Sequence, residues 1–168
     1  MAETVLAFDT SAAHCAAALL LPGGRVLTRL EPMEKGQAER LMPLLEELLR
    51  EAGLGWSDLT RLAVGTGPGN FTGVRIAVAA ARGLALGLGI PAVGITRLEA
   101  LAFDLPRPIT VVEDARRGEV YVQGFGTETS EALLLDGSDL AHVVETAHVT
   151  GSAAGPAGLP AAVPLAEA

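Results

Sequence analysis

The sequence has few of the residues that carry most enzyme and metal chemistry. It contains a single cysteine, Cys15, and a single lysine, Lys35, and only 4% of its residues are aromatic. One cysteine excludes an intrachain disulfide and indicates a reducing compartment. The three histidines, His14, His142 and His148, are scattered, with neither an H-x-x-x-H pair nor a cysteine cluster beside them. The sequence therefore predicts no metal site.

The lysine-containing phosphate loop of nucleotide-binding proteins is also missing. A Walker A loop, G-x-x-x-x-G-K-[ST], needs a lysine after its last glycine, and Lys35 lies in no such loop. The dinucleotide pattern G-x-G-x-x-G fails too, because Asn70 and Thr72 stand where its third glycine would be. What remains is a Gly-Pro-Gly turn at 67–69, ahead of a long apolar run. Its glycines either leave backbone N–H groups free for an anion or allow a tight turn and close helix packing.

Positive charge is scarce relative to negative charge. The 168-residue chain has a net charge of −8 and a pI near 4.8, with 49% hydrophobic and 19% charged residues. This composition is that of a globular chain. Its acidity excludes a stand-alone nucleic-acid binder, so a partner would supply the positive surface for RNA. The N-terminus carries Glu3 and no basic segment, which argues against a signal peptide. The apolar run 74–88 contains Arg82 and is predicted too short to cross a membrane, so we expect a soluble cytoplasmic protein.

Hydrophobic periodicity predicts a mixed α/β fold for the first half of the chain. From Leu41, leucines recur at i, i+3, i+4, i+7 and i+8 with charged residues between them, as in an amphipathic helix. The Gly-Pro-Gly turn separates a short apolar strand from a long helix that ends at Leu88. The predicted order is β-β-β-α-β-α-β-α, beginning with an antiparallel meander. The expected strands are 5–9, 14–21, 25–30, 62–64 and 90–95, and the expected shorter helices are 36–52 and 98–103.

The second half begins like the first, with a strand, an aspartate, a turn and a strand. Pro106 and Pro108 mark a linker, and the expected strands are 109–114, 119–125 and 133–135, followed by a short helix at 138–144. After Val149 the chain is rich in Ala, Gly and Pro, so we expect little core and loose order there. Two hairpins that each follow an acid suggest an actin-like architecture with a first lobe at 1–104 and a shortened second lobe at 105–168.

Two hairpin turns carry the candidate polar sites, and neither predicts a catalytic residue. At the first turn, Asp9 with its hydroxyl neighbours would either hold a phosphate or simply form the turn. At the second turn, the charged run at 114–119 would either contact an anion or partner or be a solvated bend. The candidate anion or nucleotide contacts are Asp9, Thr10, Ser11, Gly67, Gly69, Asp114 and Arg116.

The long helix carries a different signal, because it is apolar almost all the way round. A helix apolar on every side is predicted to be buried on every side. One side would pack on the sheet, and the other would be covered by the 36–52 helix or by another subunit. The predicted partner-interface residues are Leu41, Leu45, Leu48, Val74, Ala77, Val78, Ala81 and Leu84.

Three motifs resemble those of the TsaB (YeaZ) family across most of residues 4–125. They are LAFDTSAAHCAAALL at 6–20, G-P-G-x-F-T-G-x-R from Gly67 to Arg75 within the matching stretch 65–101, and D-A-R-x-G-E-V-Y from Asp114 to Tyr121 within the matching stretch 111–121. A further matching stretch is QAERLMPLLEELL at 37–49. Beyond Thr127 we find little to match. The resemblance implies an actin-like, ribonuclease H-like fold and a role in forming threonylcarbamoyladenosine (t6A) at position 37 of tRNA. The related transferase TsaD carries a metal-binding histidine motif. Here Arg97 and Leu101 stand in place of its two histidines, and neither arginine nor leucine can ligate a metal.

The resemblance therefore implies a pseudo-enzyme that binds and activates TsaD, mainly through the helices expected at 36–52 and 71–88. The implied partners are TsaD in a heterodimer, TsaE in a larger complex and a second copy when the chain is alone, with tRNA contacted only indirectly and no membrane involved. No tightly bound cofactor is implied, and ADP or ATP at the partner interface is the one option left open. Two other hypotheses are a stand-alone ATP-dependent kinase or acyltransferase and a peptidase, for which no nucleophile–base pair is found.

Overall fold

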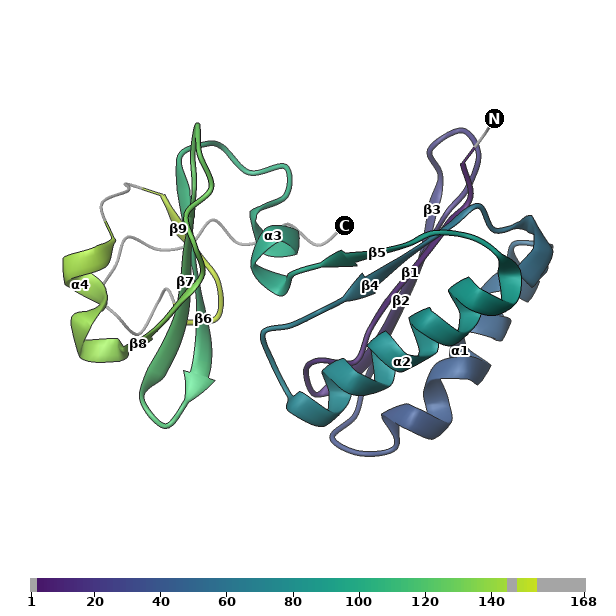
Figure 1. The fold of residues 1–168 in the computed structure, drawn as a ribbon, viewed down its shortest axis with the longest axis horizontal. Helices are drawn as coiled ribbons and strands as arrows, with labels where there is room; N and C mark the ends of the chain where they lie inside the picture. The colour runs from purple at the N-terminus through teal and green to yellow at the C-terminus, as the bar shows by residue number, and fades with distance from the viewer. Residues whose placement is uncertain (1–2, 145–147, 154–168) are drawn as a thin grey trace. The chain divides into compact units, whose positions relative to one another are not determined.

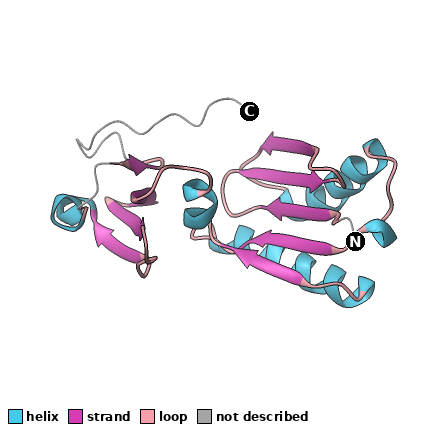
Figure 2. Cartoon of the chain, turned by 90° about the horizontal axis from the view of Figure 1, so that it is seen from above, coloured by secondary structure: helices cyan, strands magenta, loops and turns pink. Residues whose placement is uncertain are grey.

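A computed structural model describes residues 3–144 and 148–153. The chain forms two compact units, Met1–Arg97 and Leu98–Ala168, which are described separately below. The described strands belong to two different sheets, drawn in magenta in Figure 2. The units divide after Arg97, a few residues before the boundary expected at residue 104, because α3 packs with the strands that follow it.

The first unit has the predicted order of elements. Its five-stranded sheet runs β3-β2-β1-β4-β5, antiparallel from β1 to β3 and parallel from β1 through β4 to β5. The predicted meander is confirmed, and so are the positions of both helices. The elements are β1 (Val5–Asp9), β2 (His14–Leu20), β3 (Val26–Pro32), α1 (Gln37–Glu51), a short 3-10 turn (Trp56–Asp58), β4 (Arg61–Gly65), α2 (Phe71–Leu88) and β5 (Ala92–Ile95).

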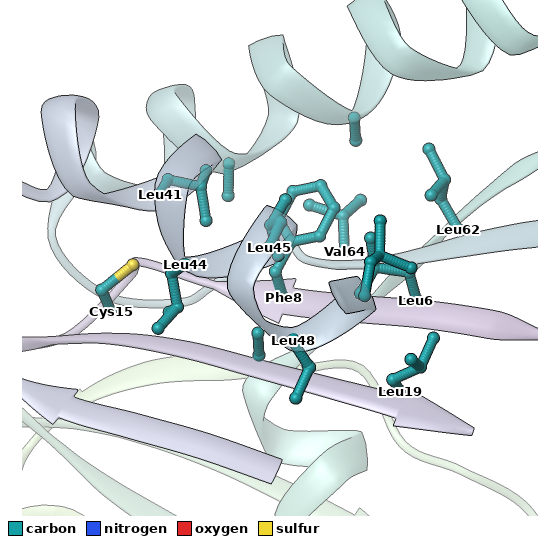
Figure 3. Close-up of a cluster of buried hydrophobic side chains, with 14 of the residues drawn as sticks. Leu6, Phe8, Cys15, Leu19, Leu41, Leu44, Leu45, Leu48, Leu62 and Val64 are labelled. Atoms are coloured by element: carbon teal, nitrogen blue, oxygen red, sulfur yellow. The ribbon is translucent and has the colours of Figure 1, made fainter. Parts of the chain in front are cut away.

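Both helices cover one face of this sheet, running side by side over it (Figure 1). The leucine face of α1 is fully buried against alternate residues of β1 and β2, because a strand turns every second side chain to the same face. Figure 3 shows Leu45 and Leu48 of α1 directed toward Phe8 and Leu19 of the strands. The core of this unit is therefore built by the pattern that predicted the helix.

Within the chain itself α2 is not buried on every side, so the 36–52 helix does not cover its outer side, and cover by another subunit stays a prediction. Only Gly73, Ala77 and Ala81 of its 18 residues are buried, while Phe71 is 67% and Leu86 is 87% exposed. The helix meets the sheet through this narrow row of small side chains, which leaves most of its circumference uncovered. It spans Phe71–Leu88, the range expected for it, and by length and composition alone it is long and apolar enough to cross a membrane. The expectation that it is too short is therefore wrong, although its buried row packs on the sheet as in other α/β units.

The second unit is a four-stranded sheet in the order β8-β7-β6-β9. The hairpin of β6 and β7 is antiparallel, and β9 lies parallel to β6. Leu98 and Ala102 of α3 pack with Ile109, Val111 and Phe125 of the hairpin. The elements are α3 (Arg97–Ala102), β6 (Ile109–Arg116), β7 (Glu119–Phe125), β8 (Leu133–Asp136), a 3-10 turn (Gly137–Asp139), α4 (Leu140–Val143) and β9 (Val149–Thr150).

The chain remains well anchored just beyond Val149, contrary to the expectation of loose order there. The backbone N–H of Ser152 donates to Oε1 of the buried Glu113 at 2.7 Å, and the N–H of Ala153 donates to the Val112 carbonyl at 3.2 Å. These bonds hold the turn after β9 against β6. The rest of the expected loose tail, from residue 154 on, lies outside the described residues.

Candidate functional site

The first candidate site lies at the end of β1, where the Asp9 carboxylate is held by its neighbours. Its Oδ1 accepts from the Ser11 N–H at 2.8 Å, its Oδ2 accepts from the Ser11 hydroxyl at 2.9 Å, and His14 Nε2 lies 3.4 Å from Oδ2. Burial raises the pKa of Asp9, but the hydrogen bonds from His14 and Ser11 outweigh it and hold that pKa below its usual value. Asp9 is therefore an ionised carboxylate whose oxygens are already engaged.

The glycine loop before α2 packs directly on this turn. The buried Thr10 hydroxyl donates to the Gly73 carbonyl at 2.6 Å, and the Asn70 N–H donates to the Ser11 carbonyl at 2.6 Å. A Cβ added at Gly69 or Gly73 would collide with the carbonyl oxygens of Ser11 and Thr10. Of the two roles considered for these glycines, the geometry supports close packing.

The first turn of α2 has little spare capacity to bind an anion. The Asn70 side chain caps the helix by accepting from the N–H groups of Thr72 at 2.9 Å and Gly73 at 3.2 Å. The Gly67 carbonyl accepts from the Arg97 N–H at 2.7 Å. The structure thus brings Asp9, Thr10, Ser11, Gly67 and Gly69 together, but their hydrogen bonds go to other groups of this chain, and anion binding there remains a prediction.

Asp114 and Arg116 lie together in the second unit, at the end of β6. The Asp114 Oδ1 accepts from the Arg116 N–H at 2.8 Å, and both side chains are exposed. Within residues 3–144 and 148–153, no group of three or more His, Cys, Asp or Glu side chains is placed to hold a metal ion. Arg97 and Leu101 both lie on α3.

A pocket of about 260 Å³ lies between the starts of α1 and α2. It was not predicted from the sequence. Residues 34–39 line one side, and Asn70, Thr72, Gly73 and Ile76 line the other. Lys35 contributes to it, but so do Glu34 and Glu39, so neither sign of charge dominates.

Most of the predicted partner-interface residues are not available to a partner. Leu41, Leu45, Leu48, Ala77 and Ala81 are at most 2% exposed, because they form this chain's own core. The remaining three are only partly exposed; they are Val74, Val78 and Leu84. The five buried residues were wrongly assigned, because an apolar periodicity marks a buried face without saying which neighbour buries it. For the other three, contact with a partner stays a prediction.

The exposed face of α2 is an uncovered side of the kind that the sequence analysis expected, but its residues are not the ones predicted for the interface. We call it the α2 outer stripe; its members are Phe71, Arg75, Ala79, Arg82, Gly83, Leu86 and Gly87. The Arg75 guanidinium stacks over the Phe71 ring at 3.7 Å from its centre. In the part of the chain that the structure describes, nothing outside the helix's own backbone lies within 4 Å of a Cβ added at Gly83 or Gly87. Each glycine costs about 1 kcal/mol relative to alanine inside a helix, and no contact within the chain explains that cost. The small residues at 79, 83 and 87 recur every fourth position, a signal already present in the sequence.

Comparison with known proteins shows what the chain is similar to. It matches the family model for TsaD, tRNA N6-adenosine threonylcarbamoyltransferase, over residues 31–151. It is 41% identical over 123 residues to the tRNA threonylcarbamoyladenosine biosynthesis protein TsaB of Haemophilus influenzae, and 37% identical over 122 residues to that of Escherichia coli. Each alignment covers 70% of this chain and 52% of the relative, so the chain spans about half the length of the curated relatives it matches.

Two solved structures match over a larger share of their length. YeaZ from Pseudomonas aeruginosa superposes with a TM-score of 0.79 at 32% identity, covering 95% of this chain and 81% of that one. A Pseudomonas aeruginosa protein described as similar to peptidase YEAZ gives 0.77 at 34% identity, covering 89% and 74%. The expectation that little matches beyond Thr127 is wrong, since the family model extends to residue 151.

Proposed function

Because this chain belongs to the TsaB (YeaZ) family, we propose that it is a non-catalytic subunit required for t6A37 formation in tRNA, acting by binding and activating the transferase TsaD. Curated relatives named for threonylcarbamoyladenosine biosynthesis support the pathway. The actin-like fold supports a subunit that resembles the transferase it assists. We propose a cytoplasmic location, where tRNA modification takes place.

The α2 outer stripe is the observation that carries the proposal. Exposed apolar side chains at both ends, Phe71 and Leu86, flank the small residues Ala79, Gly83 and Gly87. Small residues four positions apart let two helices approach closely, and buried apolar area drives the association in water. An exposed face of this kind, apolar apart from Arg75 and Arg82, marks an association site. We place a helix of TsaD on it.

The polar turn at Asp9 supports a subunit without its own chemistry. Ser11 and Asn70 are committed to hydrogen bonds within the chain, and the helix start is capped by a side chain. A second copy would occupy the same stripe when TsaD is absent, so homodimer and heterodimer exclude each other. TsaE would join the TsaD complex, ADP or ATP would bind at the partner interface, and tRNA would be held mainly by the partner.

The test combines two kinds of stripe variant with one control. Ala79→Arg places a charge in the stripe, and Ala100→Arg makes the same change at an exposed helical alanine of α3. We expect Ala79→Arg to abolish co-elution with TsaD and the dependent tRNA modification, while Ala100→Arg leaves both intact. Gly83→Ala should weaken the complex about tenfold, because overpacking a close contact costs about 1–3 kcal/mol.

Two outcomes would reject the proposal. Stripe variants that co-elute with TsaD as well as the unaltered chain does would show that the interface lies elsewhere. ATP turnover by the purified chain alone, lost on Asp9→Ala, would instead favour a stand-alone kinase or acyltransferase.

A further inference from the structure

The net negative charge of the protein lies entirely in its second unit. Up to Arg97 the chain has nine acidic and nine basic residues, whereas from Leu98 on it has eleven acidic residues and only three arginines. Two of those arginines, Arg116 and Arg117, are neighbours at the turn between β6 and β7. We call these two residues the arginine tip.

The backbone of the arginine tip is strained. Arg116 has φ 67°, Arg117 has φ 56°, and Gly118 follows with φ 85°, so three successive residues are left-handed. Only glycine enters this region freely, and Asn and Asp tolerate it better than a long side chain does. Among the described residues, the other non-glycine residue with positive φ is Asp104. Strain of this kind persists only where the surroundings enforce it, and it concentrates at functional sites.

Neighbouring groups hold the strained turn from both sides. The Asp114 carboxylate accepts from the Arg116 N–H, and the Asp114 N–H in turn donates to the Ser152 hydroxyl at 3.0 Å. On the other side, the Gly118 carbonyl accepts from the Gly137 N–H at 2.7 Å. The turn is therefore a fixed platform for two guanidinium groups.

Neither guanidinium of the arginine tip forms an ion pair with a carboxylate in the described part of the chain. In the first unit, by contrast, Arg29, Arg40 and Arg61 each contact a glutamate. Glu119 stands opposite Arg116 in the strand register, yet no ion pair joins them. Both arginines are exposed, so two unpaired cations project from an otherwise acidic unit.

We propose that the arginine tip binds phosphodiester groups of the tRNA while TsaD holds it, an inference that rests on the proposed function above. The guanidinium fork matches the oxygens of a phosphate and can bind it through two hydrogen bonds. The net negative charge of the second unit repels RNA, so RNA would approach it where exposed cations such as these two guanidinium groups lie. The alternative ligand is a protein. A protein with a neutral or basic surface would instead bind the acidic residues of the second unit, and that contact would not require a strained arginine pair.

The decisive variant is Arg116→Asn combined with Arg117→Gly, which removes both charges and suits the left-handed backbone. We expect a higher Tm for the chain and unchanged co-elution with TsaD. The complex should bind tRNA more weakly, and the slope of log K against log salt should fall by about 2, since each duplex phosphate contact contributes about 0.9. Replacing both arginines by lysine should restore most of the slope. Arg107→Gln, which removes the unit's remaining arginine, stacked on Phe125, is the matched control and should leave the slope unchanged.

Each other outcome overturns a defined claim. If the unaltered chain and TsaD do not co-elute, the proposed function fails and this inference falls with it. If they co-elute and the double variant keeps the same tRNA affinity and slope, only the arginine tip proposal fails. Loss of TsaD binding in the variant would make the tip a protein contact instead. Competition by excess ADP that needs the arginines would assign the phosphate to a free nucleotide and overturn the RNA assignment.

Discussion

The Thr10 hydroxyl donates a 2.6 Å hydrogen bond to the carbonyl of Gly73, which lies 63 residues further along the chain. The side chain is fully buried, and this bond fastens the turn after β1 to the first turn of α2. The position of the outer stripe relative to the sheet therefore depends on a polar contact as well as on apolar packing.

Thr10→Val, which keeps the shape of the side chain but removes the donor, should destabilise the protein by about 1–3 kcal/mol. The reason is that a buried acceptor loses its partner. Urea unfolding measures the change, and Thr28→Val at an exposed position of β3 is the control, expected to change stability by less than about 0.5 kcal/mol. Equal effects at both positions would show that the Thr10 bond contributes nothing particular.

Two glycines of the same helix should respond to alanine in opposite directions. Gly73→Ala forces a Cβ against the Thr10 carbonyl and should destabilise the chain by about 1–3 kcal/mol. Gly83→Ala meets open space in the monomer and should stabilise the chain by about 0.5–1 kcal/mol when it is dilute enough to be monomeric. Thermal unfolding of the chain without partners tests both. A destabilising Gly83→Ala would mean that this helix face is already covered, in a homodimer for example, and dilution would then distinguish the two cases.

Sequence periodicity gave the strands and helices of the first unit because alternation and the leucine repeat of α1 report burial directly. On α2 it did not identify which residues face the sheet, because alanine and glycine carry almost no periodic contrast. Ala77 and Ala81 were therefore assigned to a partner, although they pack in this chain's own core. The left-handed backbone at Arg116 and Arg117 could not be predicted from the sequence, because arginine is not one of the residue types that favour such a turn. The anchored turn at 151–153 was also missed, because it depends on the distant Glu113 carboxylate.

Stability should depend on the ionisation of Asp9 at acidic pH. Its pKa is lowered in the folded state, so the stabilisation is fully present above the unfolded value of about 3.9 and is lost as pH falls through the folded value. Urea unfolding from about pH 6 down to about pH 3 should show the unaltered chain losing stability faster than Asp9→Asn, which keeps an acceptor for Ser11 but cannot be protonated in this range. Parallel pH profiles for the two proteins would contradict the hydrogen bonds assigned to this carboxylate.

Cys15 should be unreactive in the folded protein. Its side chain, on β2, lies fully buried in the core of the first unit, and burial, together with the nearby Glu31 carboxylate, raises the pKa of the thiol to about 11. At pH 8 only about one thiol in a thousand would be ionised, and the thiolate is the reactive form. A disulfide-exchange reagent at pH 8 should therefore label the native chain far more slowly than the chain in denaturant, at a rate limited by opening of the core. Thr10→Val and Gly73→Ala should both speed labelling, because they loosen the contact between α2 and the β1 turn. Rapid labelling of the unaltered native chain would mean that the helices do not shield Cys15 from the reagent. It would contradict the packing of the helices on β1 and β2, on which the position of the outer stripe depends.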